Sequence, residues 1–115
     1  MNFESRIRRY EVIYHGGGKR TGIRAAIKLR GRSNQLLGTA HFHQKEADLP
    51  GLDQVAIRDK SNPHVSMHMH REDFIEVLDL LRNEDPLFLC FAGNDEGEGV
   101  ATICTAPEAI GEGEA

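Results

Sequence analysis

Alternation of apolar and polar residues dominates the chain, and this period of two is typical of strands that bury one face. In residues 23–30 the apolar side chains occupy the odd positions, and Arg or Lys occupies most of the even positions. Residues 7–15 and 34–45 alternate in the same way, and the glycine-rich segment 15–22 supplies the residues that a hairpin loop needs. We therefore expect these three segments to form an antiparallel meander.

The second half of the chain predicts shorter strands and a single helix. Strands are expected at residues 54–58, 64–70, 87–93 and 100–106, which are apolar or alternating and are bounded by turn residues. From Phe74 to Leu81, apolar residues recur at helical spacing and predict one helix over about residues 71–84, which Pro86 ends. The sequence thus predicts an α+β fold: a predominantly antiparallel sheet of about seven strands, curved or closed into a barrel, with one helix packed on it.

The register of the hairpin between residues 54–58 and 64–70 decides which face its histidines occupy. If residues 59–63 form the loop, Arg58 pairs with His64 and Ala56 pairs with Ser66. The histidines then share a polar face, while the valine and methionines between them face the core. A loop shorter by one residue would move every side chain to the other face, since the period of a strand is two. We expect the first register.

Length and composition are those of an ordinary globular domain. The 115 residues, 39% of them hydrophobic and 28% charged, fit one compact domain over residues 1–106, with residues 107–115 as a flexible acidic tail. The chain has no apolar run long enough to cross a membrane, and its start lacks the apolar segment of a secretory signal. Cys90 and Cys104 lie in apolar strands without CxxC spacing, which favours free thiols and a cytoplasmic location.

Two short rows of histidines are the most distinctive chemistry in the sequence. His41 and His43 alternate along one strand, and residues 64–70 (HVSMHMH) place three more histidines on one face of another. Imidazole nitrogens bind zinc, nickel and iron, and Glu46 could add a carboxylate. The candidate ligands of such a metal ion are His41, His43, Glu46, His68 and His70.

The segment HFHQKE, residues 41–46, resembles a motif of the cupins, in which HxH and a following Glu line a small barrel and hold a metal ion. The glutamate stands one residue earlier here, and no second cupin motif with its later histidine follows. The resemblance implies a metal-binding protein that binds or converts a small molecule. Two other interpretations stay open. The rows could be a polar strand face without a common target, or a pH-responsive surface, since protonating all six histidines changes the formal charge from -4 to +2.

Charge is divided unevenly along the chain. Residues 1–45 carry ten Lys or Arg against two Glu, a balance of +8, and residues 46–115 carry four against sixteen Asp or Glu, a balance of -12. The basic half predicts a second candidate site, for nucleic acid or another anionic ligand, although the acidic chain as a whole disfavours nucleic acid. The candidate residues are Arg6, Arg8, Arg24, Lys28 and Arg30.

No motif in the sequence identifies a reaction. There is no GxSxG elbow, and neither cysteine has a neighbouring basic motif, so we expect a non-catalytic domain that acts by binding. Residues 86–93 (PLFLCFAG) are apolar at both alternating positions, which requires cover on both faces of the strand. One helix covers only one face, so the other face must lie inside a closed barrel or at a subunit interface. We expect a homodimer or another protein partner, with the metal-binding and anion-binding interpretations as alternatives.

Overall fold

The computed structural model describes residues 1–16, 22–57 and 63–107, which form one sheet with one α-helix. The eight strands lie in the order β1-β7-β8-β5-β6-β4-β3-β2, and neighbours are antiparallel except for β4 and β6. The helix α1 is Phe74–Asn83, directly preceded by a 3-10 turn at Arg71–Asp73. The strands are β1 Asn2–Ile7, β2 Arg9–Tyr14, β3 Ile23–Arg30, β4 Leu36–His43, β5 Asp53–Ile57, β6 Pro63–His70, β7 Leu87–Gly93 and β8 Glu98–Thr105.

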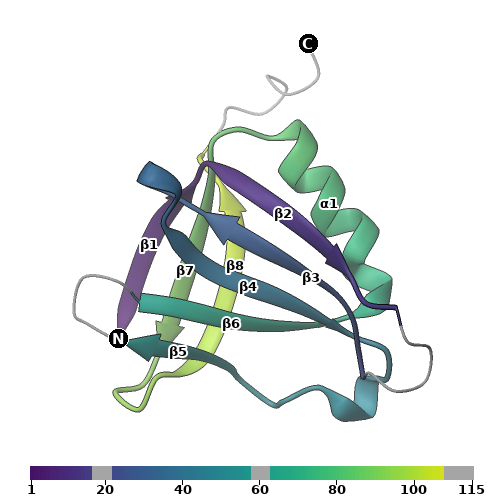
Figure 1. The fold of residues 1–115 in the computed structure, drawn as a ribbon. Helices are drawn as coiled ribbons and strands as arrows, with labels where there is room; N and C mark the ends of the chain where they lie inside the picture. Colours follow the sequence, from purple (N-terminus) through teal and green to yellow (C-terminus); the bar gives the residue numbers. More distant parts are fainter. Residues whose placement is uncertain (17–21, 58–62, 108–115) are drawn as a thin grey trace.

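The sheet curls into a half-barrel, and α1 packs against the inside of the curl (Figure 1). Inward-facing side chains form the core, in which Ile27, Phe42 and Leu89 are at most 1% exposed. Phe74, at the start of α1, meets the Phe42 ring edge-on with the ring centroids 5.2 Å apart. Leu81, two turns further along the helix, is also buried. The predicted apolar stripe of the helix is therefore the face that packs on the core.

The predicted fold class is confirmed in outline, since the structure is mostly β with one helix on a curled, mostly antiparallel sheet. The predicted meander is also confirmed as β2, β3 and β4. The expectation of about seven strands misses β1, which pairs with β7 at one end of the sheet. β1 ends and β2 begins around Arg8, whose N–H donates to the Arg30 carbonyl at 2.8 Å. Nothing in the local alternation indicates that the chain changes partners there.

The parallel pairing of β4 with β6 is the main feature of the topology that local patterns do not predict. β5 follows β4 in the chain, yet β6 lies between them in the sheet. The connection, residues 44–52, contains a 3-10 turn at Glu46–Asp48. This crossover brings the two histidine rows into register, with His41 beside His68 and His43 beside His70.

The hairpin of β5 and β6 has the predicted faces but not the predicted pairs. Ala56 pairs with His64, so the expected pairing of Ala56 with Ser66 is wrong by two residues, and Arg58 lies outside the described residues. A shift of two leaves every side chain on its face, because the period of a strand is two. The apolar residues of β6 accordingly face the core, and its histidines lie on the outer face of the sheet.

β7 carries apolar residues on both faces, as its sequence predicts. Leu89 and Phe91 point into the half-barrel and are at most 2% exposed. Phe88 and Cys90 alternate with them on the outer face and are only partly buried. Val100 of β8 continues this outer face and is 57% exposed. The expected homodimer stays a prediction, and it is this outer face that a partner would cover.

Three predicted features lie wholly or partly outside the described residues: residues 17–21 of the glycine-rich loop, residues 59–62 of the loop predicted at 59–63, and residues 108–115 of the acidic tail. Among the helices that the structure describes, none has the length and apolar character needed to cross a membrane. The cytoplasmic location stays a prediction.

Candidate functional site

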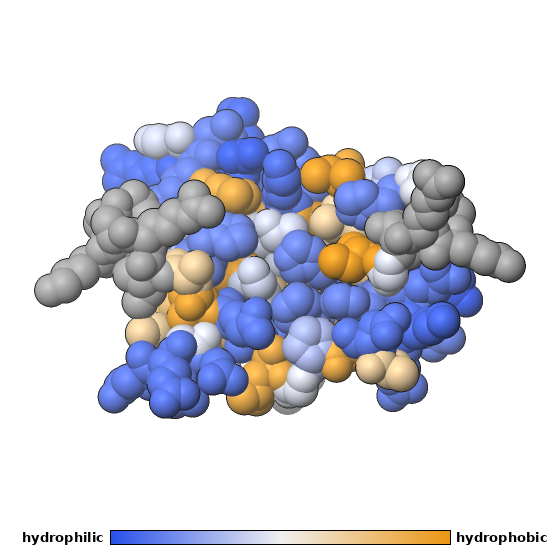
Figure 2. Space-filling view, turned by 60° about the horizontal axis from the view of Figure 1, so that its bottom comes forward, coloured by the Kyte–Doolittle hydropathy of each residue, from blue (hydrophilic) through white to orange (hydrophobic). Residues whose placement is uncertain are grey.

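The histidine rows of β4 and β6 lie side by side on the outer face of the sheet. His41 pairs with His68, and His43 pairs with His70. Figure 2 looks onto this side of the molecule, where polar residues in blue surround small, separate apolar patches. The crossover thus brings together two rows that are more than twenty residues apart in the sequence.

Two imidazoles of these rows are in direct contact. His43 Nε2 and His68 Nδ1 are 3.0 Å apart, a hydrogen-bond distance at which one ring nitrogen donates and the other accepts. The His41 ring stacks on the His68 ring with centroids 5.3 Å apart. Within the described part of the chain, His68 Nε2 is buried without a hydrogen-bond partner. We call His41, His43 and His68 the histidine cluster.

The histidine cluster is partly shielded from solvent. His43 is 7% exposed, although it lies on the outer face. Burial, reinforced by the neighbouring histidines, lowers the pKa of His41 to about 4. Burial and the nearby His43 also lower the pKa of His68, an effect that Asp53 partly opposes. His41 and His68 are therefore neutral at pH 7, which is the form of imidazole that binds a metal ion.

The predicted metal ligands gather at one end of β4 and β6 without converging on one point. Glu46, His68 and His70 line a cleft of about 550 Å³. His70 has a structural role as well, because its Nδ1 accepts the Glu72 N–H at 3.3 Å and so caps the turn that begins the helix. Across the three described ranges, no three His, Cys, Asp or Glu side chains stand in positions that could hold a metal ion. The metal prediction therefore stays a prediction.

Acidification is expected to destabilise the protein through His41. Its pKa falls from 6.5 to about 4 on folding, so between these values the unfolded chain binds the proton and the folded chain does not. The stability linked to this residue is present above pH 6.5 and is lost as the pH falls toward 4. Urea unfolding across this range, with a chelator present, should show a smaller loss for His41→Gln than for the wild type. Equal losses in the two proteins would contradict the prediction.

Asp53 joins two strands through its carboxylate, a role that the sequence does not indicate. Its Oδ1 accepts the His68 backbone N–H at 2.8 Å, and its Oδ2 accepts the Ala101 N–H at 2.9 Å. β5 begins at this residue and pairs with β8 through two residue pairs. The carboxylate therefore links β6 and β8 where the strand β5 no longer separates them. A single Asp at the first position of a short strand has no spacing signal that would predict this role.

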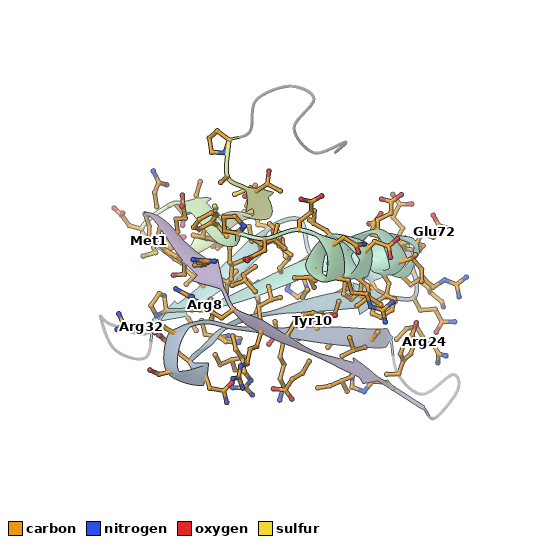
Figure 3. The ribbon with its side chains drawn as sticks, turned by 90° about the horizontal axis from the view of Figure 1, so that it is seen from above. Met1, Arg8, Tyr10, Arg24, Arg32 and Glu72 are labelled. Atoms are coloured by element: carbon orange, nitrogen blue, oxygen red, sulfur yellow. The ribbon has the colours of Figure 1, made fainter. Side chains whose placement is uncertain are left out.

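A second candidate site lies at the other end of β4, where the β1–β2 connection meets the β3–β4 turn. Residues of the two connections line clefts of about 560 and 220 Å³, and Arg8 and Arg32 line both. A third cleft, of about 630 Å³, extends from Arg8 to the end of α1. Figure 3 shows Arg8 and Arg32 at the same end of the sheet and Arg24 at the opposite end. We call Arg6, Arg8, Arg9 and Arg32 the arginine corner.

The predicted anion-binding residues are divided between several places. Arg6 and Arg8 belong to the arginine corner, whereas Arg24 is near the other end of β3. Lys28 lies in the middle of β3, opposite Glu11 of β2. Arg32, which lines two of these clefts, is not among the predicted residues, because it lies in a turn rather than in the alternating pattern of a strand.

Arg30 positions the turn that carries Arg32. Its Nε donates to the Glu11 carboxylate, and its Nη1 donates to the Asn34 carbonyl at 3.2 Å. The hydrogen bond from Arg30 and its charge lower the pKa of Glu11. In the turn, Ser33 and Asn34 have φ angles of 56° and 63°, a left-handed conformation that costs a residue with a side chain roughly 1–2 kcal/mol. Backbone strain of this kind is concentrated at functional sites.

Cys90 and Cys104 lie on the outer face of the β7–β8 hairpin with their sulfur atoms 2.9 Å apart. Both are free cysteines, as the sequence predicts. Burial and the contact with Cys104 raise the pKa of Cys90 to about 11. This thiol is therefore protonated at pH 7, so it is a poor nucleophile.

No family model, curated protein or solved structure matches this chain. The similarity of residues 41–46 to the cupin motif is therefore limited to one short segment. The histidine cluster and the arginine corner are the features that indicate a function.

Proposed function

We propose that this domain is a non-catalytic binding module whose arginine corner holds a compact, multiply charged anion such as a phosphate-bearing small molecule. The observation that supports this most directly is that Arg8 and Arg32 line the same two clefts. Arg9, Ser33 and Asn34 complete the larger of the two, and none of its described lining residues is acidic. Guanidinium groups bind phosphate oxygens through paired hydrogen bonds, and hydroxyl and amide groups supply further donors.

The positive charge of the arginine corner is little compensated by its surroundings. Within the described residues, Arg6 is the one member with an ion pair, to Asp85 at 3.3 Å. Both partners are exposed, and such surface pairs contribute little to stability. An arriving anion therefore meets three guanidinium groups that do not first have to release a carboxylate.

The form of the clefts favours a compact anion over a nucleic acid. The two clefts that Arg8 and Arg32 share have no aromatic side chain among their described lining residues, and stacking on such side chains is how proteins usually hold unpaired bases. The chain also has a net charge of -4. Away from the corner, this charge repels the rest of a long polyanion.

Isothermal titration calorimetry with pyrophosphate tests the proposal. Arg8→Gln and Arg32→Gln are each expected to weaken binding at least about tenfold, because a hydrogen bond to a charged group contributes roughly 1.5–3 kcal/mol. The affinity should also fall as the salt concentration rises, since the site acts through charge.

Arg24→Gln is the matched control, because it removes the same charge at the opposite end of the sheet (Figure 3). It is expected to leave pyrophosphate binding nearly unchanged. Equal weakening by all three substitutions, or no binding at millimolar pyrophosphate, would overturn the proposal. Preferential binding of a short oligonucleotide that is lost in the same two variants would replace the compact anion with a nucleic acid.

A further inference from the structure

The two cysteines of the chain face each other across the β7–β8 hairpin. Cys90 stands opposite Thr102, and Cys104 stands opposite Phe88, so the cysteines are diagonal neighbours on the outer face of the sheet. Their sulfur atoms are 2.9 Å apart. A disulfide has a sulfur–sulfur distance of about 2.03–2.05 Å. The two sulfurs therefore have to approach each other by less than about 1 Å for a bond to form.

The position of the two cysteines in the sheet allows this approach. Both are partly exposed, so a small oxidant can reach them. Cys104 is the second-last residue of β8, and the pairing of β8 with β7 ends one residue later, at Thr105. The end of a strand opens at a lower cost in free energy than its middle. Neither cysteine is part of the buried core cluster, so the bond can close without repacking the core.

We propose that Cys90 and Cys104 are an oxidation site, at which a low-molecular-weight disulfide such as glutathione disulfide converts the two thiols into a reversible disulfide within the chain. The bond joins two strands that already pair from Leu87 to Gly93, so it forms on the existing fold. In reducing compartments, disulfides are usually transient and serve redox sensing or catalysis. Neither cysteine is among the described lining residues of the three clefts around Arg8, so the inference is independent of the proposed anion binding.

The reaction proceeds by two thiol–disulfide exchanges. Burial and the contact with Cys104 raise the pKa of Cys90 to about 11, so Cys104 is the thiol that loses its proton first. Its thiolate attacks one sulfur of glutathione disulfide, which forms a mixed disulfide and releases one glutathione thiolate. Cys90 then gives up its proton and attacks the Cys104 sulfur, which releases the second glutathione thiolate. The protein loses two protons and two electrons, and glutathione disulfide gains them as it becomes two glutathione thiols.

Intact-mass spectrometry of the full chain in glutathione redox buffers tests this inference. As the ratio of oxidised to reduced glutathione rises, the wild type is expected to lose the mass of two hydrogen atoms without gaining glutathione. Dithiothreitol should restore both thiols. Because a disulfide that closes a short loop restricts the unfolded chain, the oxidised protein should melt roughly 5–15 °C higher than the reduced protein. In urea, the same disulfide should form at least about tenfold less favourably, since the unfolded chain no longer holds the sulfurs together.

Cys90→Ser and Cys104→Ser are the matched controls, because each leaves one thiol in its native place. Both variants are expected to gain one glutathione in the same buffers and to show no rise in melting temperature of the size expected for the disulfide. Cys90→Ser, which keeps Cys104, should gain glutathione faster than Cys104→Ser.

Four results would overturn the inference: a wild type that stays reduced in excess glutathione disulfide, one that keeps two bound glutathiones, a disulfide between two chains, or a disulfide that forms equally well in urea. The wild-type chain alone distinguishes these results from the expected one. The test therefore stays decisive if a serine variant folds poorly.

Discussion

Replacing Asp53 by alanine is expected to lower the free energy of unfolding by about 3 kcal/mol. The substitution removes the acceptors of two backbone N–H groups, those of His68 in β6 and Ala101 in β8. Hydrogen bonds to a charged group contribute roughly 1.5–3 kcal/mol each, and water that enters after the substitution recovers a part of this energy. The two hydrogen bonds are lost at a place where β5 and β8 share two residue pairs. Few other hydrogen bonds between strands can compensate for them there.

Urea denaturation measures this effect, with Asp79→Ala as the matched control. Asp79 is exposed on α1, and its loss removes the same charge from a position where alanine favours the helix. The control is expected to change stability by less than about 0.5 kcal/mol. Asp53→Asn keeps one carbonyl acceptor, so its loss of stability should be intermediate between those of Asp53→Ala and Asp79→Ala. Equal stability of Asp53→Ala and Asp79→Ala would mean that the carboxylate does not hold β6 and β8 together.

Replacing Gly99 by alanine is expected to destabilise the protein by about 3 kcal/mol or more. A Cβ atom there would overlap the Ala92 carbonyl oxygen and would stand 2.5 Å from the Gly93 Cα. Both atoms belong to the backbone of β7, so no side chain can move aside to make room. The overlap can be relieved only if β8 separates from β7 where Gly99 pairs with Gly93. Substitutions that overpack a site and shift the backbone are among the more destabilising ones.

Thermal unfolding followed by circular dichroism measures the result, and Gly51→Ala is the control. Gly51 lies in the β4–β5 connection, and a Cβ atom there would meet nothing within 4 Å. This control is expected to keep the wild-type melting temperature or to raise it slightly, because alanine restricts the unfolded chain. A Gly99→Ala protein as stable as Gly51→Ala would show that the hairpin can open at this point without cost.

The local elements of this protein follow from its sequence. β3, β6 and α1 lie where alternation or helical spacing predicts them, because the period of the side chains is a property of neighbouring residues. The same reasoning placed the β6 histidines on the face opposite its apolar residues, and it held even though the predicted pairs were wrong by two residues. Composition further predicts one small domain, and the basic residues are concentrated in the first half of the sequence.

Only the tertiary structure decided which of these elements meet. The contact of His43 with His68 depends on β6 lying between β4 and β5 in the sheet, and neither histidine row contains information about that crossover. Arg8 and Arg32 share two clefts because the β1–β2 connection reaches the β3–β4 turn. The sequence could therefore name the side chains capable of binding a metal ion or an anion. Which of them face a common ligand depends on non-local strand pairing, which patterns within single strands do not record.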